Sequence, residues 1–560
     1  MSTANDQKPN KKQGSHGRSP YQNKGRQLDD SAWTDVRALL ADGPRKREYL
    51  IEYLHLIQDK FGHLSAAHMR ALAAELKLAQ TEVYEVATFY HHFDVVKEGE
   101  NAPPALTVRV CDSITCEMKG SAALMAKLKS VVGGNVRVIH APCVGACDRA
   151  PVAVVKQRQI FNANADSVKA AIDGGDVTQP LPNYKDLTAY RKEGGYAVLA
   201  ACLKGERGRD QTVEIIKESG LRGLGGAGFP TATKWSFMKN APKPRLVAIN
   251  ADEGEPGTFK DRHCFETDPH RVIEGALIAA WSVEAKGVYI YLRDEYPACR
   301  EVLLTEIKKV EDAGLNGDIK LHLRRGAGAY ICGEESGMLE SIEGNRGLPR
   351  NRPPFPAQAG LWGRPTLINN VETVYWLPKI IENGAKWYQD QGQPHFFSVS
   401  GRVKEPGVKL APAGTTARQL IEDYSGGMED GHTFTAYLPG GASGGVLPES
   451  LADEPLDFGT LDKHGCFIGS SAVVIFSQND DIADICKNLI RFFEDESCGQ
   501  CTPCRVGCEK MLKLIDQPKW NADLINELSQ AMRDASICGL GQAAPNPVQS
   551  ALKFFGEKVQ

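Results

Sequence analysis

The sequence lacks the features that direct a chain into a membrane, out of the cell or onto nucleic acid. It contains no run of about 18 predominantly apolar residues, which argues against a membrane-spanning helix. Its first residues include no apolar segment of the secretory type. Its net charge is only −4, so it has no overall basic footprint for nucleic acid. We therefore expect a cytoplasmic protein with no membrane span and no nucleic-acid partner.

The composition is that of a soluble globular protein rich in cysteine. Hydrophobic residues make up 42% of the chain and charged residues 24%, which are ordinary values. A length of 560 residues allows several domains with sizeable cores. Fifteen cysteines without a secretion signal indicate metal sites in a reducing compartment rather than disulfides.

One group of cysteines has the spacing of a cubane cluster. Cys498, Cys501 and Cys504 follow one another at three-residue intervals, and Cys538 lies on a later segment. A [4Fe-4S] cluster is held by four thiolates, often three close together and one remote, so we predict one here. Zinc is the alternative, although it usually takes two separated cysteine pairs. Cys508, four residues past Cys504, is interpreted as a spare thiol.

A second group of cysteines follows two expected strands. The strand at 106–110 leads to Cys111 and Cys116. The strand at 136–139 leads to Cys143 and Cys147, after a helical stretch near 120–132. Each iron of a [2Fe-2S] cluster needs two thiolates, so this small α/β unit is predicted to hold one. A zinc site with four cysteines is the alternative.

The region before these cysteines divides into a polar tail and a helical part. Residues 1–30 have almost no large apolar residues, so we expect a disordered tail. Residues 31–100 show helical periodicity, as at Leu50, Ile51 and Leu54, and predict a helical bundle. No cysteine or carboxylate completes a metal-binding spacing around His91 and His92, so a structural or surface role is expected for both.

A glycine-rich loop and three strand ends predict a nucleotide site. The loop from Gly223 to Gly228 contains G-x-G-x-x-G, but a helix-like segment precedes it and Pro230 follows, so it is not a Rossmann fingerprint. Apolar strands at 245–249, 288–292 and 319–323 each end in a polar loop. Ligands of open α/β sheets lie at such strand ends.

These motifs carry two family resemblances. Residues 87–93 (Ala-Thr-Phe-Tyr-His-His-Phe), with the four cysteines between 111 and 147, resemble the 24-kDa subunit of respiratory complex I over about 35–170. The chain from about 185 to 550 resembles the 51-kDa, NADH-oxidising subunit. That likeness rests on the [4Fe-4S] cysteines and on five motifs: Gly223 to Trp235, Asn250 to Pro256, Ala329 to Glu335, Pro353 to Pro356 and Asn369 to Thr373.

The resemblances imply an α/β multidomain protein. After the bundle they place a thioredoxin-like [2Fe-2S] domain at 101–175 and an FMN- and NAD-binding α/β domain at 185–395. A ubiquitin-like β-grasp domain at 396–480 and a helical [4Fe-4S] domain at 481–560 complete the chain. No side chain is assigned as a catalytic acid, base or nucleophile.

The second resemblance also implies the cofactor contacts. FMN would be bound by Gly223, Gly225, Lys234, Asn250, Asp252, Glu253, Tyr330, Gly333, Glu334, Asn369, Asn370 and Thr373. NAD would contact Phe229, Phe237, Glu255, Glu335, Arg352 and Phe355. At position 352 the family typically has lysine; arginine keeps the positive charge and can grip a phosphate with two parallel hydrogen bonds.

The cofactor set favours a protein that links NAD to one-electron carriers. A flavin is needed between a two-electron hydride carrier and one-electron clusters. The acidic loops suit a ribose diol and repel a 2′-phosphate, which favours NAD over NADP.

A fusion of two complex I subunits resembles the diaphorase (beta) subunit of molybdenum- or tungsten-containing NAD-dependent formate dehydrogenase, including at Arg109–Cys116 and Ser400–Pro412. The resemblance implies a large alpha subunit with the metal–pterin site and further iron–sulfur clusters, and assembly into a larger complex. The diaphorase subunit of an NAD-reducing hydrogenase is one alternative. A scaffold that carries clusters but no nucleotide is the other.

Overall fold

The computed structural model describes residues 26–559, so most of the predicted tail lies outside the described residues. The first described residues already pack on the protein. The Arg26 carbonyl accepts hydrogen bonds from Arg70 and Gln80. Asp29 caps the first helix, which begins at Asp30, through the backbone N–H of Ala32 at 2.8 Å.

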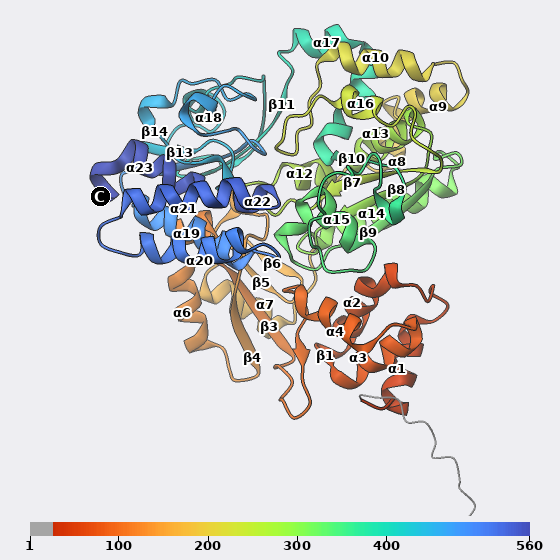
Figure 1. The fold of residues 1–560 in the computed structure, drawn as a ribbon, viewed down its shortest axis with the longest axis horizontal. Helices are drawn as coiled ribbons and strands as arrows, with labels where there is room; N and C mark the ends of the chain where they lie inside the picture. The colour runs from red at the N-terminus through yellow and green to blue at the C-terminus, as the bar shows by residue number, and fades with distance from the viewer. Residues whose placement is uncertain (1–25, 560) are drawn as a thin grey trace, which may run out of the picture.

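The N-terminal part is the predicted helical bundle, drawn in red in Figure 1. A short parallel pair, β1 (Leu64–Ser65) with β2 (Val95–Val96), joins the connection between its second and third helices to the segment that follows its last helix. Tyr90, buried at the end of the bundle, donates to the Asn345 carbonyl at 2.7 Å, so the bundle is anchored to a segment far along the chain. The bundle helices are α1 (Asp30–Leu40), α2 (Leu50–Phe61), α3 (Ala66–Leu76) and α4 (Gln80–Phe89).

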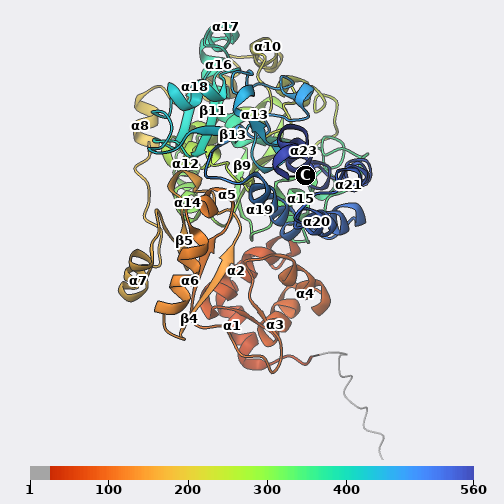
Figure 2. The same cartoon turned by 90° about the vertical axis from the view of Figure 1, so that its left-hand side faces the viewer.

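A four-stranded sheet of order β4-β3-β5-β6 follows. Its two parallel strands end in Cys111 and in Ala141, which lies next to the second cysteine loop. Val108 and Val110 point into the core of this unit, as alternation along a strand requires. Figure 2 shows it beside the bundle. Its elements are β3 (Leu106–Cys111), α5 (Ile114–Met118), α6 (Ser121–Val131), β4 (Val136–Ala141), β5 (Ala153–Val155), β6 (Arg158–Ile160) and α7 (Ala165–Gly174).

The central unit is a parallel sheet of order β10-β7-β8-β9. Parallel strands put their carboxyl ends at one edge, where a ligand site is expected. The sequence predicted β7, β8 and β9 but missed β10, which lies beside β7 with Asn370 opposite Asn250. The strands are β7 (Arg245–Ala251), β8 (Ala285–Leu292), β9 (Lys320–Arg325) and β10 (Thr366–Asn370). The helices around them are α8 (Leu187–Lys192), α9 (Ala197–Leu203), α10 (Arg209–Ser219), α11 (Thr231–Ser236), α12 (Lys260–Thr267), α13 (Pro269–Ser282), α14 (Pro297–Asp312), α15 (Glu335–Ile342), α16 (Val371–Asn383) and α17 (Ala385–Asp390).

The last third is a mixed sheet followed by helices. The sheet order is β12-β11-β15-β13-β14. The helices, blue in Figure 1, begin at Ile482, as predicted. The elements are β11 (His395–Gly401), β12 (Gly407–Ala411), α18 (Ala417–Glu422), β13 (Phe434–Leu438), β14 (Leu447–Pro448), β15 (Ala472–Ser477), α19 (Ile482–Asp495), α20 (Thr502–Ile515), α21 (Ala522–Ala535), α22 (Gly539–Ala543) and α23 (Asn546–Val559). Within residues 26–559, no helix combines the length and apolarity needed to span a membrane.

Candidate flavin and iron–sulfur sites

A cavity of about 360 Å³ lies at the carboxyl ends of the central parallel strands. The sequence-distant segments predicted to bind FMN converge there, because β7 and β10 are neighbours and the loop after β9 folds over their ends. The predicted residues that line it are Gly225, Asn250, Asp252, Glu253, Glu255, Tyr330, Gly333, Glu334 and Asn370.

Glycines bring the backbone close to this cavity. A Cβ atom at Gly225 would lie 2.9 Å from the Cβ of Asn370. The Gly223 backbone N–H donates to the Phe229 carbonyl at 2.8 Å and closes the glycine-rich loop. The Thr373 hydroxyl accepts a hydrogen bond from the Leu224 N–H at 2.9 Å, which holds that loop against α16. The loop therefore has the close backbone approach that a flat or phosphorylated ligand needs.

Two predicted FMN ligands have buried polar atoms without a hydrogen-bond partner among the described residues. These atoms are Asp252 Oδ2 and Asn369 Nδ2. Burial raises the pKa of Asp252 well above its ordinary value. An unsatisfied buried polar group costs about 1–3 kcal/mol, so both atoms fit a bound group that offers a donor and an acceptor. The FMN ring edge has that chemistry.

Two glutamates of the loop after β7 are held rigidly. The Glu253 carboxylate accepts from the backbone N–H of Asp261 at 2.8 Å and from the Tyr296 hydroxyl at 2.9 Å. Burial raises the Glu253 pKa to about 7. The Glu255 carboxylate accepts from the Ser443 N–H at 2.7 Å and from the Tyr330 hydroxyl. Both acids are therefore oriented before any ligand arrives.

The residues that line the cavity but were not identified from the sequence include Thr258, Lys260 and Asp261. Lys260 is almost fully buried, with its ammonium 2.9 Å from Asp261 Oδ1 and 2.9 Å from Glu372 Oε2. Asp261 Oδ2 in turn accepts from the Asn370 amide at 2.6 Å. Their position in the sequence could have identified them, because residues 258–261 closely follow the predicted loop that ends at Pro256.

Five of the six predicted NAD contacts form an open aromatic and charged rim, whereas the sixth, Glu255, is buried in the flavin cavity. Phe229, Phe237 and Phe355 are 44%, 56% and 52% exposed. The rings of Phe229 and Phe237 lie 6.1 Å apart. Large aromatic residues grouped at the surface are typical of binding sites.

The charges of the rim come from helix α11, from the start of helix α15 and from the segment that contains Arg352. Lys234 pairs with Glu335, and Arg352 pairs with Glu334. Arg352 also lies 3.9 Å from Glu335 Oε2. The structure thus brings together two predicted FMN contacts, Lys234 and Glu334, and two predicted NAD contacts, Glu335 and Arg352.

The four cysteines predicted to hold the [2Fe-2S] cluster come together at the ends of β3 and β4. All four are buried, and Cys143 Sγ lies 3.4 Å from Cys147 Sγ. Hydrogen bonding between these thiols raises the pKa of Cys111 and lowers that of Cys143. Mutual hydrogen bonding shows that the sulfurs face a common centre, as a cluster requires.

The four cysteines predicted to hold the [4Fe-4S] cluster line a small cavity at the start of α20. Ile331 and Leu540 line this cavity and also the flavin cavity, so these two residues form a wall that the two sites share. Cys508 is buried one turn beyond Cys504, and its hydrogen bond is the main cause that lowers the Cys504 pKa to about 7.

His92 lies away from both cysteine groups in its contacts. Its Nδ1 is 2.7 Å from Asp294 Oδ2, in an ion pair.

The cavity, the exposed rim and the two cysteine quartets define a flavin- and iron–sulfur-dependent oxidoreductase linked to NAD. Three family models match the chain. They are the Nuo51 FMN-binding domain at residues 216–379, the thioredoxin-like [2Fe-2S] ferredoxin at 36–175 and the NADH-ubiquinone oxidoreductase-F iron–sulfur binding region at 484–560. They confirm the predicted fold class and the FMN, [2Fe-2S] and [4Fe-4S] cofactors; NAD binding is typical of this family.

Curated relatives identify the family. An NADH-quinone oxidoreductase F subunit of Rhizobium meliloti is 41% identical over 395 residues, which are 67% of this chain and 94% of the relative. The F subunit of the Aquifex aeolicus enzyme is 40% identical over 399 residues, or 67% of this chain and 91% of the relative. The chain belongs to the family of NADH-quinone oxidoreductase F subunits.

Solved structures extend the likeness to nearly the whole chain. A crystal structure of an NAD+-reducing [NiFe]-hydrogenase in the H2-reduced state is 31% identical and covers 92% of this chain and 93% of the other, with a TM-score of 0.80. A crystal structure of an NAD+-reducing [NiFe]-hydrogenase in the air-oxidised state is 30% identical and covers 93% of this chain and 95% of the other, with a TM-score of 0.81.

Proposed function

We propose that this chain is the diaphorase subunit of a larger NAD-linked enzyme, which exchanges electrons between NAD(H) and a partner subunit. The observation that carries the proposal is the shared wall between the flavin cavity and the [4Fe-4S] cysteines, formed by Ile331 and Leu540. Bound FMN supplies the chemistry that connects a two-electron donor to a one-electron acceptor. A protein that only carried clusters would not need such a cavity.

The residues of the cavity would hold the flavin in a fixed orientation. Asp252 and Asn369 would offer their unpaired polar atoms to the ring, and the glycine-rich loop would let it approach the backbone. Lys260, with Asp261 and Glu372, keeps a positive charge in a buried place, which would stabilise negative charge that develops on the ring.

The rim would hold the dinucleotide. Phe229, Phe237 and Phe355 offer aromatic faces for stacking. Glu335 would accept hydrogen bonds from ribose hydroxyls, and Arg352 would meet the pyrophosphate. Binding would then have to loosen the ion pairs of these two residues with Lys234 and Glu334.

The partner is proposed to be a formate-oxidising subunit with a molybdenum or tungsten pterin site. The proposal rests on the likeness at Arg109–Cys116 and Ser400–Pro412. The sequence has no recognisable pterin- or nickel-binding motif, so the oxidation itself is assigned to the partner. A hydrogen-oxidising partner is the second candidate. It is favoured by the NAD+-reducing hydrogenase structures, which match the fused arrangement along more than nine-tenths of this chain.

The test of the diaphorase proposal uses the full chain loaded with FMN and both clusters. NADH should bleach the flavin in stopped flow and support reduction of ferricyanide, whereas formate and hydrogen should reduce nothing. A folded, fully loaded chain that does not react with NADH would refute the proposal. Turnover of formate by the chain alone would refute the proposal that a partner subunit oxidises the substrate.

The test of the partner uses the complex purified from its native source. Molybdenum or tungsten together with formate-dependent NAD+ reduction would support the first candidate. Nickel together with hydrogen-dependent NAD+ reduction would support the second.

A further inference from the structure

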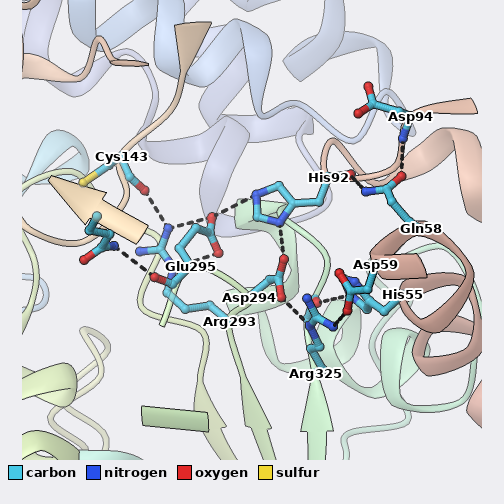
Figure 3. Close-up of polar contacts among 12 residues, drawn as sticks. His55, Gln58, Asp59, His92, Asp94, Cys143, Arg293, Asp294, Glu295 and Arg325 are labelled. Atoms are coloured by element: carbon cyan, nitrogen blue, oxygen red, sulfur yellow. Dashed lines mark hydrogen bonds and ion pairs between the residues drawn. The ribbon is translucent and has the colours of Figure 1, made fainter. Parts of the chain in front are cut away.

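Arg293 connects the flavin cavity to the [2Fe-2S] cysteines. It follows β8 directly and is only 4% exposed. One terminal nitrogen of its guanidinium donates to the backbone carbonyl of Glu253, in the loop that lines the flavin cavity. The other donates to the backbone carbonyl of Cys143 at 2.6 Å (Figure 3). A single buried cation therefore touches both sites.

The charge of Arg293 is balanced by one carboxylate. Glu295 accepts two hydrogen bonds from Arg293, at 2.9 and 3.2 Å. Its carboxylate also lies 3.7 Å from His92 Nε2, so it is shared with a second basic group. Arg262, which donates to the Gly145 carbonyl of the same cysteine loop, is instead flanked by two carboxylates. Arg293 is thus the less neutralised of the two arginines that hold this loop.

The pair sits at the end of a chain of charges that crosses three parts of the molecule. His92 contacts Asp294 at 2.7 Å, Asp294 contacts Arg325, and Arg325 reaches Asp59 of α2 at 2.8 Å (Figure 3). These groups border a cavity of about 290 Å³ between the bundle, the thioredoxin-like unit and the central sheet. The position of Glu295 therefore depends on how the bundle is docked.

We propose that Arg293 and Glu295 are a positioning pair that sets the reduction potential of the [2Fe-2S] cluster. The inference rests on the proposed cluster ligands. Reduction adds one electron, and so one negative charge, to a cluster that four thiolates already make negative. A buried cation hydrogen-bonded to the backbone of a ligand stabilises the reduced form, and a buried anion beside it opposes that effect. Arg293 raises the potential and Glu295 lowers it.

Redox titration followed by EPR tests the pair in the full chain loaded with cofactors. Arg293→Gln should move the midpoint potential of the [2Fe-2S] signal to a more negative value, because Glu295 is left without its main partner. Arg293→Lys should keep most of the wild-type potential. Glu295→Gln should move it to a more positive value. The midpoint potential of the double variant Arg293→Gln/Glu295→Gln should be closer to the wild-type value than the potential of Arg293→Gln is.

The [4Fe-4S] cluster of the same chain is an internal reference for the titration, because its midpoint potential should stay unchanged in all four variants. Lys308→Gln is the control that also replaces a cation by an amide, because Lys308 lies on α14 in an exposed pair with Asp312; it should leave both potentials unchanged. An unchanged [2Fe-2S] potential in Arg293→Gln, or a negative shift in Glu295→Gln, would overturn the inference. If Arg293→Gln does not fold, Arg293→Lys and Glu295→Gln still decide it. Absence of a [2Fe-2S] signal in the wild type would instead refute the proposed ligands.

Discussion

Glu335 lies where the charged rim meets the flavin cavity, and its carboxylate pairs with Lys234. We predict that Glu335→Gln raises the KM for NADH while FMN stays bound. A charge-assisted hydrogen bond to a ribose hydroxyl is worth about 1.5–3 kcal/mol, so the rise should be roughly ten-fold or more. Steady-state NADH–ferricyanide assays and flavin content measure it. Glu382→Gln, in an exposed pair with Lys379, is the control and should change neither. An unchanged KM in Glu335→Gln would show that the proposed role is wrong.

Glu253 makes stability depend on pH. Burial raises its pKa from the ordinary 4.5 to about 7, so the folded protein favours the protonated carboxyl. Protonation of Glu253 therefore contributes roughly 3 kcal/mol to the free energy of unfolding. This stabilisation is complete below about pH 4.5 and is lost as the pH rises through 7.

We therefore predict that the melting temperature of the FMN-free chain falls between pH 4.5 and 7 more steeply in wild type than in Glu253→Gln. Differential scanning fluorimetry across this range measures the two slopes. Parallel slopes would contradict the assignment of the raised pKa to Glu253.

At the scale of single residues, a polar side chain that directly follows an apolar strand is easier to identify from the sequence than one whose role depends on distant partners. Asn250, Asp252 and Glu253 follow an apolar run that predicted a ligand site, and the resemblance then assigned them to FMN. Lys260 was missed, because its role arises from contacts with Asp261 beside it and with Glu372, which is 112 positions away. Charge pairing over such a separation leaves no local pattern in the chain.

At the scale of elements, helix α20 offers the [4Fe-4S] cluster one thiol more than it needs. Cys504 and Cys508 are four residues apart, so they lie on one face of the helix. We predict that Cys498→Ser loses more iron than Cys504→Ser, since Cys508 can supply a thiolate only near position 504. Iron analysis and EPR of the reduced protein measure the loss. The double variant Cys504→Ser/Cys508→Ser should lose as much as Cys498→Ser; if it retains as much iron as Cys504→Ser, the replacement does not occur.

The parallel strand β10 shows why the candidate site was predicted only in part. It has five residues and runs directly into α16, so its apolar positions cannot be told from the start of a helix by periodicity. The resemblance alone singled out Asn369 and Asn370. The register with β7 then explains their position, because it sets Asn370 opposite Asn250 at the mouth of the cavity.

At the scale of the whole molecule, the bundle is not an appendage but shares a core with the central unit. Tyr90 is buried between the two, and its hydroxyl accepts a hydrogen bond from the Ser341 hydroxyl at 2.9 Å. Periodicity in the bundle predicted which faces are apolar, but the sequence does not say which partner covers them. The contacts across this boundary involve residues about 250 to 300 positions apart.

Arg324 allows a test of this docking. It is 4% exposed, lies over the Tyr49 ring and donates to Glu52 at 2.8 Å and to the Glu48 carbonyl at 2.9 Å. We predict that Arg324→Met leaves the Glu52 carboxylate without its partner and costs about 3 kcal/mol. This is the lower end for a broken buried pair, because Glu52 stays 25% exposed.

The bundle of the Arg324→Met variant should then open more often, while FMN remains bound to the central unit. Limited proteolysis should cut the variant faster than wild type at 97–105, the connection between the bundle and β3, at equal flavin content. Lys308→Met removes an exposed pair with Asp312 and should leave the cutting rate unchanged. Glu52→Gln added to Arg324→Met should slow cutting again, since a neutral amide is less costly to leave unpaired than a carboxylate. Equal cutting of wild type and Arg324→Met would show that the apolar contacts alone hold the bundle in place.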